Sequence, residues 1–260
     1  MNRMISFLYG LFCYAIFFGT FVYAVGFLAN SWVPKAIDSV SDAAGSAALA
    51  AVVNLMLLGL FAVQHSIMAR PGFKAWWTRF VPVQVERSTY TLLSSLVLGL
   101  LFWQWRPMTS VVWEVESPIL SWTLRGLFFL GFLLVLYASF LINHFDLFGL
   151  RQVYLYLRGI EYTPLKFGTP SLYRFIRHPL YVGWFLAFWA TPAMTQGHLL
   201  FASVASAYIL AAIVLEERDL MRFLGEDYRR YRQRVPMFVP RLLPERPPDP
   251  RRGGDMDRVC

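Results

Sequence analysis

The sequence predicts an all-α protein, a polytopic membrane helix bundle of about five to six membrane segments whose last two form a helical hairpin. Of its 260 residues, 57% are hydrophobic and only 15% are charged, whereas soluble domains carry about 25% charged residues. The hydrophobic residues fall in long runs, and about 20 apolar residues suffice for a helix to cross a bilayer. The chain has room for several such spans but for no large soluble domain.

Four spans are expected in the first part of the chain, over residues 5–29, 46–68, 89–105 and 119–142. The first run is too long for a signal-peptide core, and no A-x-A-like site follows it, so we expect it to remain as a span. Tryptophans at the end of the third run are typical of a membrane interface.

Residues 143–152 then form an amphipathic stretch, followed by a polar and aromatic connection over 153–178. From Leu180 to Leu215 no residue carries a formal charge. The Pro and Gly residues within 191–198 predict a turn between two helices of about 16 residues each, slightly short for straight spanning.

The chain is expected to end on the cytoplasmic side of the membrane. Residues 216–235 predict an amphipathic helix, and the proline- and arginine-rich tail over 241–260 predicts disorder. All but Lys35, Arg106 and Arg125 of the 24 basic residues lie at Arg3, in the loops around 70–87 and 151–177, or beyond residue 217. This is the positive-inside pattern, which places both termini in the cytoplasm.

The same distribution of basic residues limits the kinds of binding partner that we expect. The net charge of +8 follows the loops of a membrane protein, so we expect membrane lipids as neighbours and no nucleic acid. No obligate protein partner is evident. Cys13 lies in a span and Cys260 ends the chain, so neither a disulfide framework nor a metal site is expected.

A charged cluster stands at each end of the uncharged hairpin. The first reads Arg177-His178-Pro179-Leu180-Tyr181-Val182-Gly183, and the second reads Glu216-Glu217-Arg218-Asp219-Leu220. A hairpin returns the second cluster to the membrane face of the first, so the two can meet at a polar ligand. Taken singly, the first cluster would be a positive-inside anchor and the second the start of a solvated helix.

The two clusters, over about residues 173–240, resemble the C-terminal half of the integral-membrane methyltransferases typified by isoprenylcysteine carboxyl methyltransferase. The resemblance implies a cytoplasmic-facing site for S-adenosyl-L-methionine as methyl donor. Tyr181 and Gly183 would supply an aromatic face and a close backbone approach. Glu216 and Glu217 would bind hydroxyls and the ammonium group. The donors for the ligand's carboxylate would be Arg177 or His178.

Polar residues also end the second and fourth spans. His65 lies beside Gln64 and Ser66, while His144 and Asp146 are followed by Arg151. An ionisable residue at membrane depth is a candidate for function by default. The alternative is that these residues snorkel to the interface or cap helix ends.

In the N-terminal half, four segments are similar to the bacterial small-thiol S-methyltransferases of the same superfamily: Phe21–Phe27, Val33–Lys35, Gln64–Ser66 and His144–Gln152. This resemblance implies methylation of a small thiol at the bacterial inner membrane, with methanethiol as the first expectation and dimethyl sulfide as its product.

Because alkyl thiols are largely protonated at neutral pH, the enzyme needs a base or a cation near the sulfur. The candidates are His144, Asp146 and His65, with Asp146 alternatively orienting His144, and Arg151 as a cation for the developing thiolate. We therefore expect a thiol pocket within residues 1–152 and a methyl-donor site within 153–240.

Three rival functions remain open. One is a lipid or prenylcysteine acceptor in the same superfamily. Another is a nicotinamide-dependent membrane reductase, against which Trp184 counts, because those enzymes commonly have Glu after the glycine. The third is a non-enzymatic membrane accessory protein of the nitrogen-oxide-related family, which would not need the cluster at 177–183.

Overall fold

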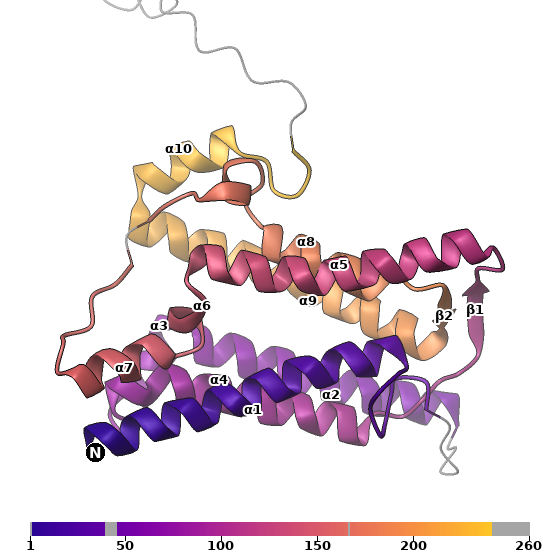
Figure 1. The fold of residues 1–260 in the computed structure, drawn as a ribbon, viewed down its shortest axis with the longest axis horizontal. Helices are drawn as coiled ribbons and strands as arrows, with labels where there is room; N and C mark the ends of the chain where they lie inside the picture. The colour runs from indigo at the N-terminus through magenta and orange to yellow at the C-terminus, as the bar shows by residue number, and fades with distance from the viewer. Residues whose placement is uncertain (1, 40–45, 166, 241–260) are drawn as a thin grey trace, which may run out of the picture.

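A computed structural model describes residues 2–39, 46–165 and 167–240, and the expected disordered tail lies outside these residues. The described residues are mostly helical, which confirms the predicted fold class (Figure 1). The elements are α1 (Arg3–Ala29), α2 (Ala47–Ala69), α3 (Pro71–Trp77), α4 (Val83–Gln104), β1 (Val111–Glu114), α5 (Pro118–Ile142), α6 (His144–Leu147), α7 (Leu150–Arg158), η1 (Ser171–Arg174), α8 (Pro179–Trp189), β2 (Ala193–Thr195), α9 (Gln196–Leu224) and α10 (Glu226–Arg234).

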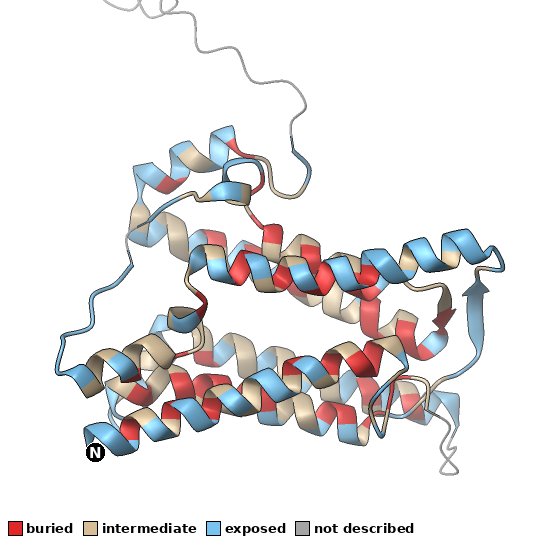
Figure 2. Ribbon diagram, viewed as in Figure 1, coloured by how far each residue is buried: buried red, intermediate tan, exposed pale blue. Residues whose placement is uncertain are grey.

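The long helices form two layers. In one, α4 packs against both α1 and α2, and in the other α8 packs against α5 and α9 (Figure 1). Helix α2 also contacts α9, which joins the layers, and the short α7 lies against α1 and α4. Buried residues line the surfaces where helices face each other, while the outer faces are exposed (Figure 2). Because these exposed faces are apolar, they fit a lipid environment.

Four helices in the described part of the chain, α1, α2, α5 and α9, are long and apolar enough to cross a membrane. Helix α4 lies beside them but begins at Val83, earlier than the expected span at 89–105. Its first turns carry Glu86 and Arg87, so this helix extends out of the apolar layer at its N-terminal end.

The hairpin differs from the prediction of two equal helices. Helix α8 has only 11 residues, about 16 Å, and α9 has 29 residues, about 44 Å. The non-helical segment 190–195 links the two helices. Ala190, Met194 and Thr195 within it are buried, as non-helical backbone beside an apolar layer must be.

The structure also differs from the prediction of a single amphipathic helix over 216–235. Residues 216–224 continue α9, because neither Gly nor Pro interrupts them. The break comes at Gly225, whose φ of 56° suits a residue without a side chain. Helix α10 follows and packs back on α9.

The end of the bundle opposite to the N-terminus carries a small ribbon that was not predicted. Strands β1 and β2 pair antiparallel there. Large aromatic side chains at this end are exposed, including Trp32 at 78%, Trp103 at 69% and Trp122 at 74%. Such a belt is typical of a membrane–water interface. The other end holds the N-terminus, α3, α6, α7 and α10 (Figure 1).

Candidate functional site

The two charged clusters of the hairpin meet, as the sequence predicted. Arg177 Nε donates to Glu217 Oε1 across 2.8 Å, and His178 Nε2 lies 3.1 Å from the same oxygen. Arg177 lies two residues before the start of α8, and Glu217 lies in the last third of α9. The backbone N–H of Arg177 also donates to the carbonyl of Pro236, so the chain beyond α10 closes over this contact.

Glu217 ties three segments of the chain together. Its side chain is 5% exposed, and its second oxygen lies 3.1 Å from Nε of Arg232 on α10. Arg177 in turn donates to the carbonyl of Val235. A buried carboxylate requires such partners, since burying it unpaired costs several kcal/mol. Glu217 therefore holds the start of α8 and the helix α10 against α9.

Tyr181 and Glu216 form the part of the cluster that reaches into the bundle. The Tyr181 hydroxyl donates to Glu216 Oε2 across 2.8 Å. Tyr181 lies within electrostatic range of Tyr208 on α9 and Tyr90 on α4. Nearby, burial and the negative charge of Glu216 raise the pKa of Tyr173 well above its ordinary value, so this phenol stays protonated. The cluster thus combines a carboxylate with neutral phenols.

Gly183 lies at a close contact between two helices that the sequence did not predict. A Cβ added at Gly183 would lie 2.7 Å from the carbonyl oxygen of Gly131 and 2.9 Å from the amide nitrogen of Val135. Its missing side chain therefore allows α8 and α5 to pack backbone to backbone. This contact is by itself sufficient to require a glycine at position 183.

His65 is the centre of a polar group between α2 and α4. Its Nε2 lies 2.9 Å from the Tyr90 hydroxyl, and its Nδ1 lies 3.2 Å from Ser94 Oγ. Ser94 also accepts from the Gln64 amide, whose Oε1 is buried with no partner in the described residues. The adjacent Ser66 hydroxyl contacts Tyr208 on α9, 3.2 Å away. Through Tyr90 and Tyr208, this group borders the Tyr181–Glu216 pair.

His144 is 2% exposed and sits among aromatic rings. Its Nε2 lies 2.8 Å from the Tyr14 hydroxyl, and its Nδ1 lies 2.8 Å from Ser139 Oγ. Because the Ser139 hydroxyl donates to the carbonyl of Leu136, it must accept from Nδ1–H, and Tyr14 must donate to Nε2. Burial lowers the pKa of His144, so the ring is neutral. It stacks on Phe140 at 4.3 Å.

Asp146 has different partners, so the structure does not bear out the idea that it orients His144. Helix α5 ends at Ile142, and Asn143 follows it with φ at 131°. Arg151 Nη1 donates to Asp146 Oδ1 across 2.8 Å, and the Tyr162 hydroxyl lies 3.3 Å from Oδ2. Both ring nitrogens of His144 are already occupied. Asp146 therefore pairs with the cation that was expected to stabilise a thiolate.

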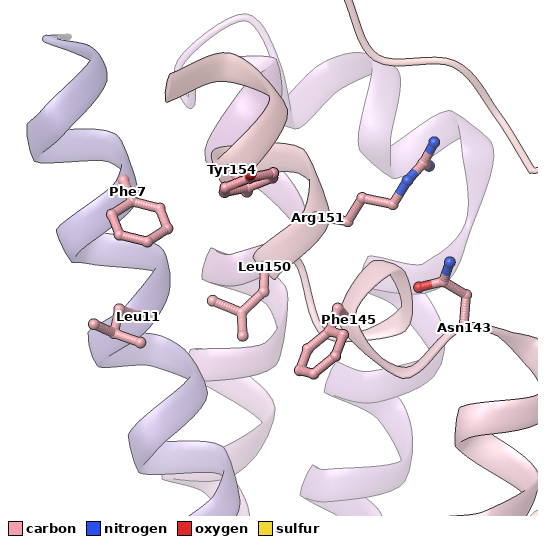
Figure 3. A pocket seen from close by; sticks show the side chains of 7 residues that line it. All are labelled: Phe7, Leu11, Asn143, Phe145, Leu150, Arg151 and Tyr154. Atoms are coloured by element: carbon pink, nitrogen blue, oxygen red, sulfur yellow. The ribbon is translucent and has the colours of Figure 1, made fainter. Parts of the chain in front are cut away.

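Two hollows adjoin Asn143. The larger, of about 510 Å³, has a mixed lining that includes Lys74, Arg87, Asp146 and Gln152, and we call it the polar hollow after these side chains. The other, of about 390 Å³, is a mainly apolar groove between α1 and α7 (Figure 3). Its lining residues are Phe7, Leu11, Asn143, Phe145, Leu150, Arg151 and Tyr154. Within the polar hollow, burial and the neighbouring Arg87 lower the pKa of Lys74.

Sequence reasoning missed Tyr90, Ser94 and Tyr208, which surround His65, and Tyr14 and Ser139, which surround His144. The signal for one pair was present. Tyr90 and Ser94 are four residues apart on α4 and therefore share a face. The others are single hydroxyls in apolar runs, which carry no such pattern.

Fold and site together define a multi-span helical membrane protein whose ionisable side chains gather towards one end of the bundle. Residues 53–237 match the model of the NnrU protein family, and the chain belongs to that family.

Several curated relatives align with most of the chain. The methanethiol S-methyltransferase of Crocosphaera subtropica is 55% identical over 240 residues, which are 92% of this chain and 93% of that protein. The methanethiol S-methyltransferase of Mycobacterium tuberculosis is 53% identical over 240 residues, 92% and 98% of the two chains. Mouse nurim is 33% identical over 186 residues, 68% and 70%. These relatives confirm the resemblance drawn from the motifs. No solved structure matches the chain.

Proposed function

We propose that this protein transfers a methyl group from S-adenosyl-L-methionine to a small thiol, and that methanethiol, converted to dimethyl sulfide, is its main acceptor. The observation that carries the proposal is the meeting of the two charged clusters at the ends of the hairpin, in particular the 2.8 Å contact of Tyr181 with Glu216. The relatives that are 50–55% identical and named for methanethiol methylation support the same acceptor.

The residues at this cluster suit the chemistry of the donor. The donor carries two ribose hydroxyls, an ammonium group, a carboxylate and a sulfonium cation. Glu216, held by Tyr181, would accept from hydroxyls or from the ammonium group. Arg177 and His178 would bind the carboxylate only by sharing with Glu217, which now occupies both. Glu217 therefore acts mainly on the position of these two side chains.

The acceptor has little for a protein to recognise. Methanethiol offers one weak S–H donor, so selection must come from a small apolar pocket, which discriminates one methylene by about 1–3 kcal/mol. Turnover of ethanethiol at a reduced rate is expected. The protein must hold the two sulfur atoms in line with the methyl carbon and favour the thiolate.

Among the candidate bases, the contacts favour His65. It is linked through Tyr90 to the surroundings of Tyr181, and Ser66 beside it contacts Tyr208. His144 is enclosed by aromatic rings, and Asp146 is paired with Arg151. We propose that His144, Asp146 and Arg151 shape the polar end of the bundle. We also propose that the protein lies in a bacterial inner membrane, with the site facing the cytoplasm and both termini in the cytoplasm.

Ligand-binding measurements distinguish the proposed function from the rival functions. Calorimetry of the purified protein in detergent should give heat with S-adenosylhomocysteine and none with NADPH. Heat with NADPH alone would instead favour a reductase, and no heat with either would favour a non-enzymatic role. A methyltransferase with a lipid or prenylcysteine acceptor would bind S-adenosylhomocysteine but leave methanethiol unmethylated.

A further inference from the structure

We infer that Tyr90, acting with His65, is the group that removes the proton from the thiol. The inference rests on the proposed function and adds a catalytic residue to it. Tyr90 belongs to α4 and is 7% exposed. Its hydroxyl lies 2.9 Å from His65 Nε2, so a proton can pass directly between phenol and imidazole.

The surroundings of His65 allow it to carry that proton. Ser94 Oγ lies 3.2 Å from Nδ1 and accepts from the Gln64 amide. A serine hydroxyl can donate to Nδ1 or accept from Nδ1–H, so either tautomer, and the imidazolium, keeps its partners. The ring of Phe61 stacks on His65 at 5.2 Å, which offsets part of the cost that burial and the nearby Arg87 put on a cationic ring.

His144 shows why a histidine–tyrosine pair alone is not sufficient. It too has a tyrosine on Nε2 and a serine on Nδ1. There the serine hydroxyl is already committed to the carbonyl of Leu136, which fixes one tautomer. That pair ties α1 to the end of α5, whereas the His65 pair is free to exchange its proton.

A cation lies on the other side of Tyr90. The guanidinium of Arg87 lies 5.2 Å from the centre of the Tyr90 ring, and Arg87 also lines the polar hollow of about 510 Å³. The charged and titratable groups that act on the Tyr90 phenol, besides His65, are Arg87 on its own helix, Arg70 at the end of α2, Tyr208 on α9 and Tyr181 on α8. The two arginines offset part of the cost that burial puts on negative charge at the phenol, and they would stabilise a thiolate formed beside it.

In the proposed step, removal of the thiol proton is coupled to methyl transfer. The thiol proton moves to the Tyr90 oxygen while the Tyr90 proton moves to His65 Nε2. The thiolate sulfur forms a bond to the donor methyl carbon as the bond from that carbon to the sulfonium sulfur breaks. The products are the methyl sulfide, S-adenosylhomocysteine and one proton on His65, which then leaves to water.

The test compares two thiols of similar shape and different acidity, ethanethiol and the more acidic 2,2,2-trifluoroethanethiol. In Tyr90→Phe, kcat/KM for ethanethiol should fall by about 100-fold or more, because general-base catalysis contributes about 10²–10⁴. The loss for the acidic thiol should be much smaller, since its thiolate forms in solution. Raising the pH should partly restore turnover of ethanethiol.

His65→Gln keeps a hydrogen-bonding side chain against Tyr90 and should show the same selective loss. Tyr9→Phe is the matched control, because it deletes a tyrosine hydroxyl that contacts Thr89 on α4, 3.0 Å away. It should leave both thiols unaffected. S-adenosylhomocysteine affinity should stay near that of the wild type in all three variants.

Equal losses for both thiols, or no loss, would overturn the inference while the proposed function stands. Loss of S-adenosylhomocysteine affinity in both Tyr90→Phe and His65→Gln would overturn it too, by making the pair part of the donor site. Wild-type protein that methylates neither thiol, nor methanethiol, would overturn the proposed function and this inference with it.

Discussion

The Tyr181 hydroxyl donates to Glu216 Oε2 across 2.8 Å, although the two residues are 35 positions apart in the chain. The hydrogen bond joins the first turn of α8 to α9 and holds the carboxylate at the inner side of the cluster. Under the proposed function, this carboxylate would accept from the donor's hydroxyl or ammonium group while the Glu217 contacts stay intact.

Glu216→Ala and Tyr181→Phe should therefore weaken binding of S-adenosylhomocysteine, measured by calorimetry, while both variants still fold. Each removes one buried polar partner, worth about 1–3 kcal/mol, or roughly 5- to 150-fold in affinity. Tyr137→Phe, which deletes a hydroxyl bonded to Ser171 at the same end of the bundle, is the control. Unchanged affinity in both test variants would place the donor site elsewhere.

Glu217→Ala should act on stability more than on chemistry. The substitution leaves Arg177, whose side chain is 9% exposed, without its carboxylate. Breaking a buried pair in this way costs about 3–5 kcal/mol. The part shared with the half-exposed Arg232 contributes less because water screens it. Thermal unfolding in detergent should show a clear loss, whereas Glu226→Ala, which breaks the exposed pair with Arg229, should change little.

Gly183→Ala should destabilise the bundle, because the added methyl group would press against the backbone of Gly131. Over-packing of this kind costs about 1–3 kcal/mol. Gly126→Ala in α5 meets no atom within 4 Å and should be neutral or slightly stabilising. Equal melting temperatures for the two variants would contradict the close packing of α5 on α8.

His144 should make the protein sensitive to acid. Burial lowers its pKa in the folded state, while the unfolded value stays near 6.5. The unfolded state therefore binds the proton first as the pH falls below about 6.5, and stability declines from there towards the folded pKa. In His144→Gln, the loss of thermal stability between pH 7 and pH 5 should be smaller than in the wild type. An identical pH dependence would show that the ring is not held neutral.

The sequence predicted the contact between the two clusters because an uncharged hairpin must return its ends to one membrane face. It could not predict that α9 continues past Glu217, since charge alone does not end a helix and the first glycine comes at residue 225. The role of Gly183 depends on Gly131, which lies far away in the sequence. Tyr90 was missed because its spacing from Ser94 marks only a shared helix face, and its partner, His65, lies on another helix.

The basic loops should face the cytoplasm. Reporter fusions at residues 80 and 165 are expected to show cytoplasmic activity, and a fusion at residue 112 in β1 is expected to show periplasmic activity. The reverse pattern would turn the proposed donor site towards the wrong compartment.

The most direct test of the central claim is headspace gas analysis of membranes supplied with methanethiol and methyl-labelled S-adenosyl-L-methionine. Membranes that contain the wild-type protein should release labelled dimethyl sulfide, and membranes that contain the Glu216→Ala, Tyr181→Phe double variant at equal abundance should release little. Absence of labelled dimethyl sulfide from the wild type, or equal release by the double variant, would contradict methyl transfer at this site.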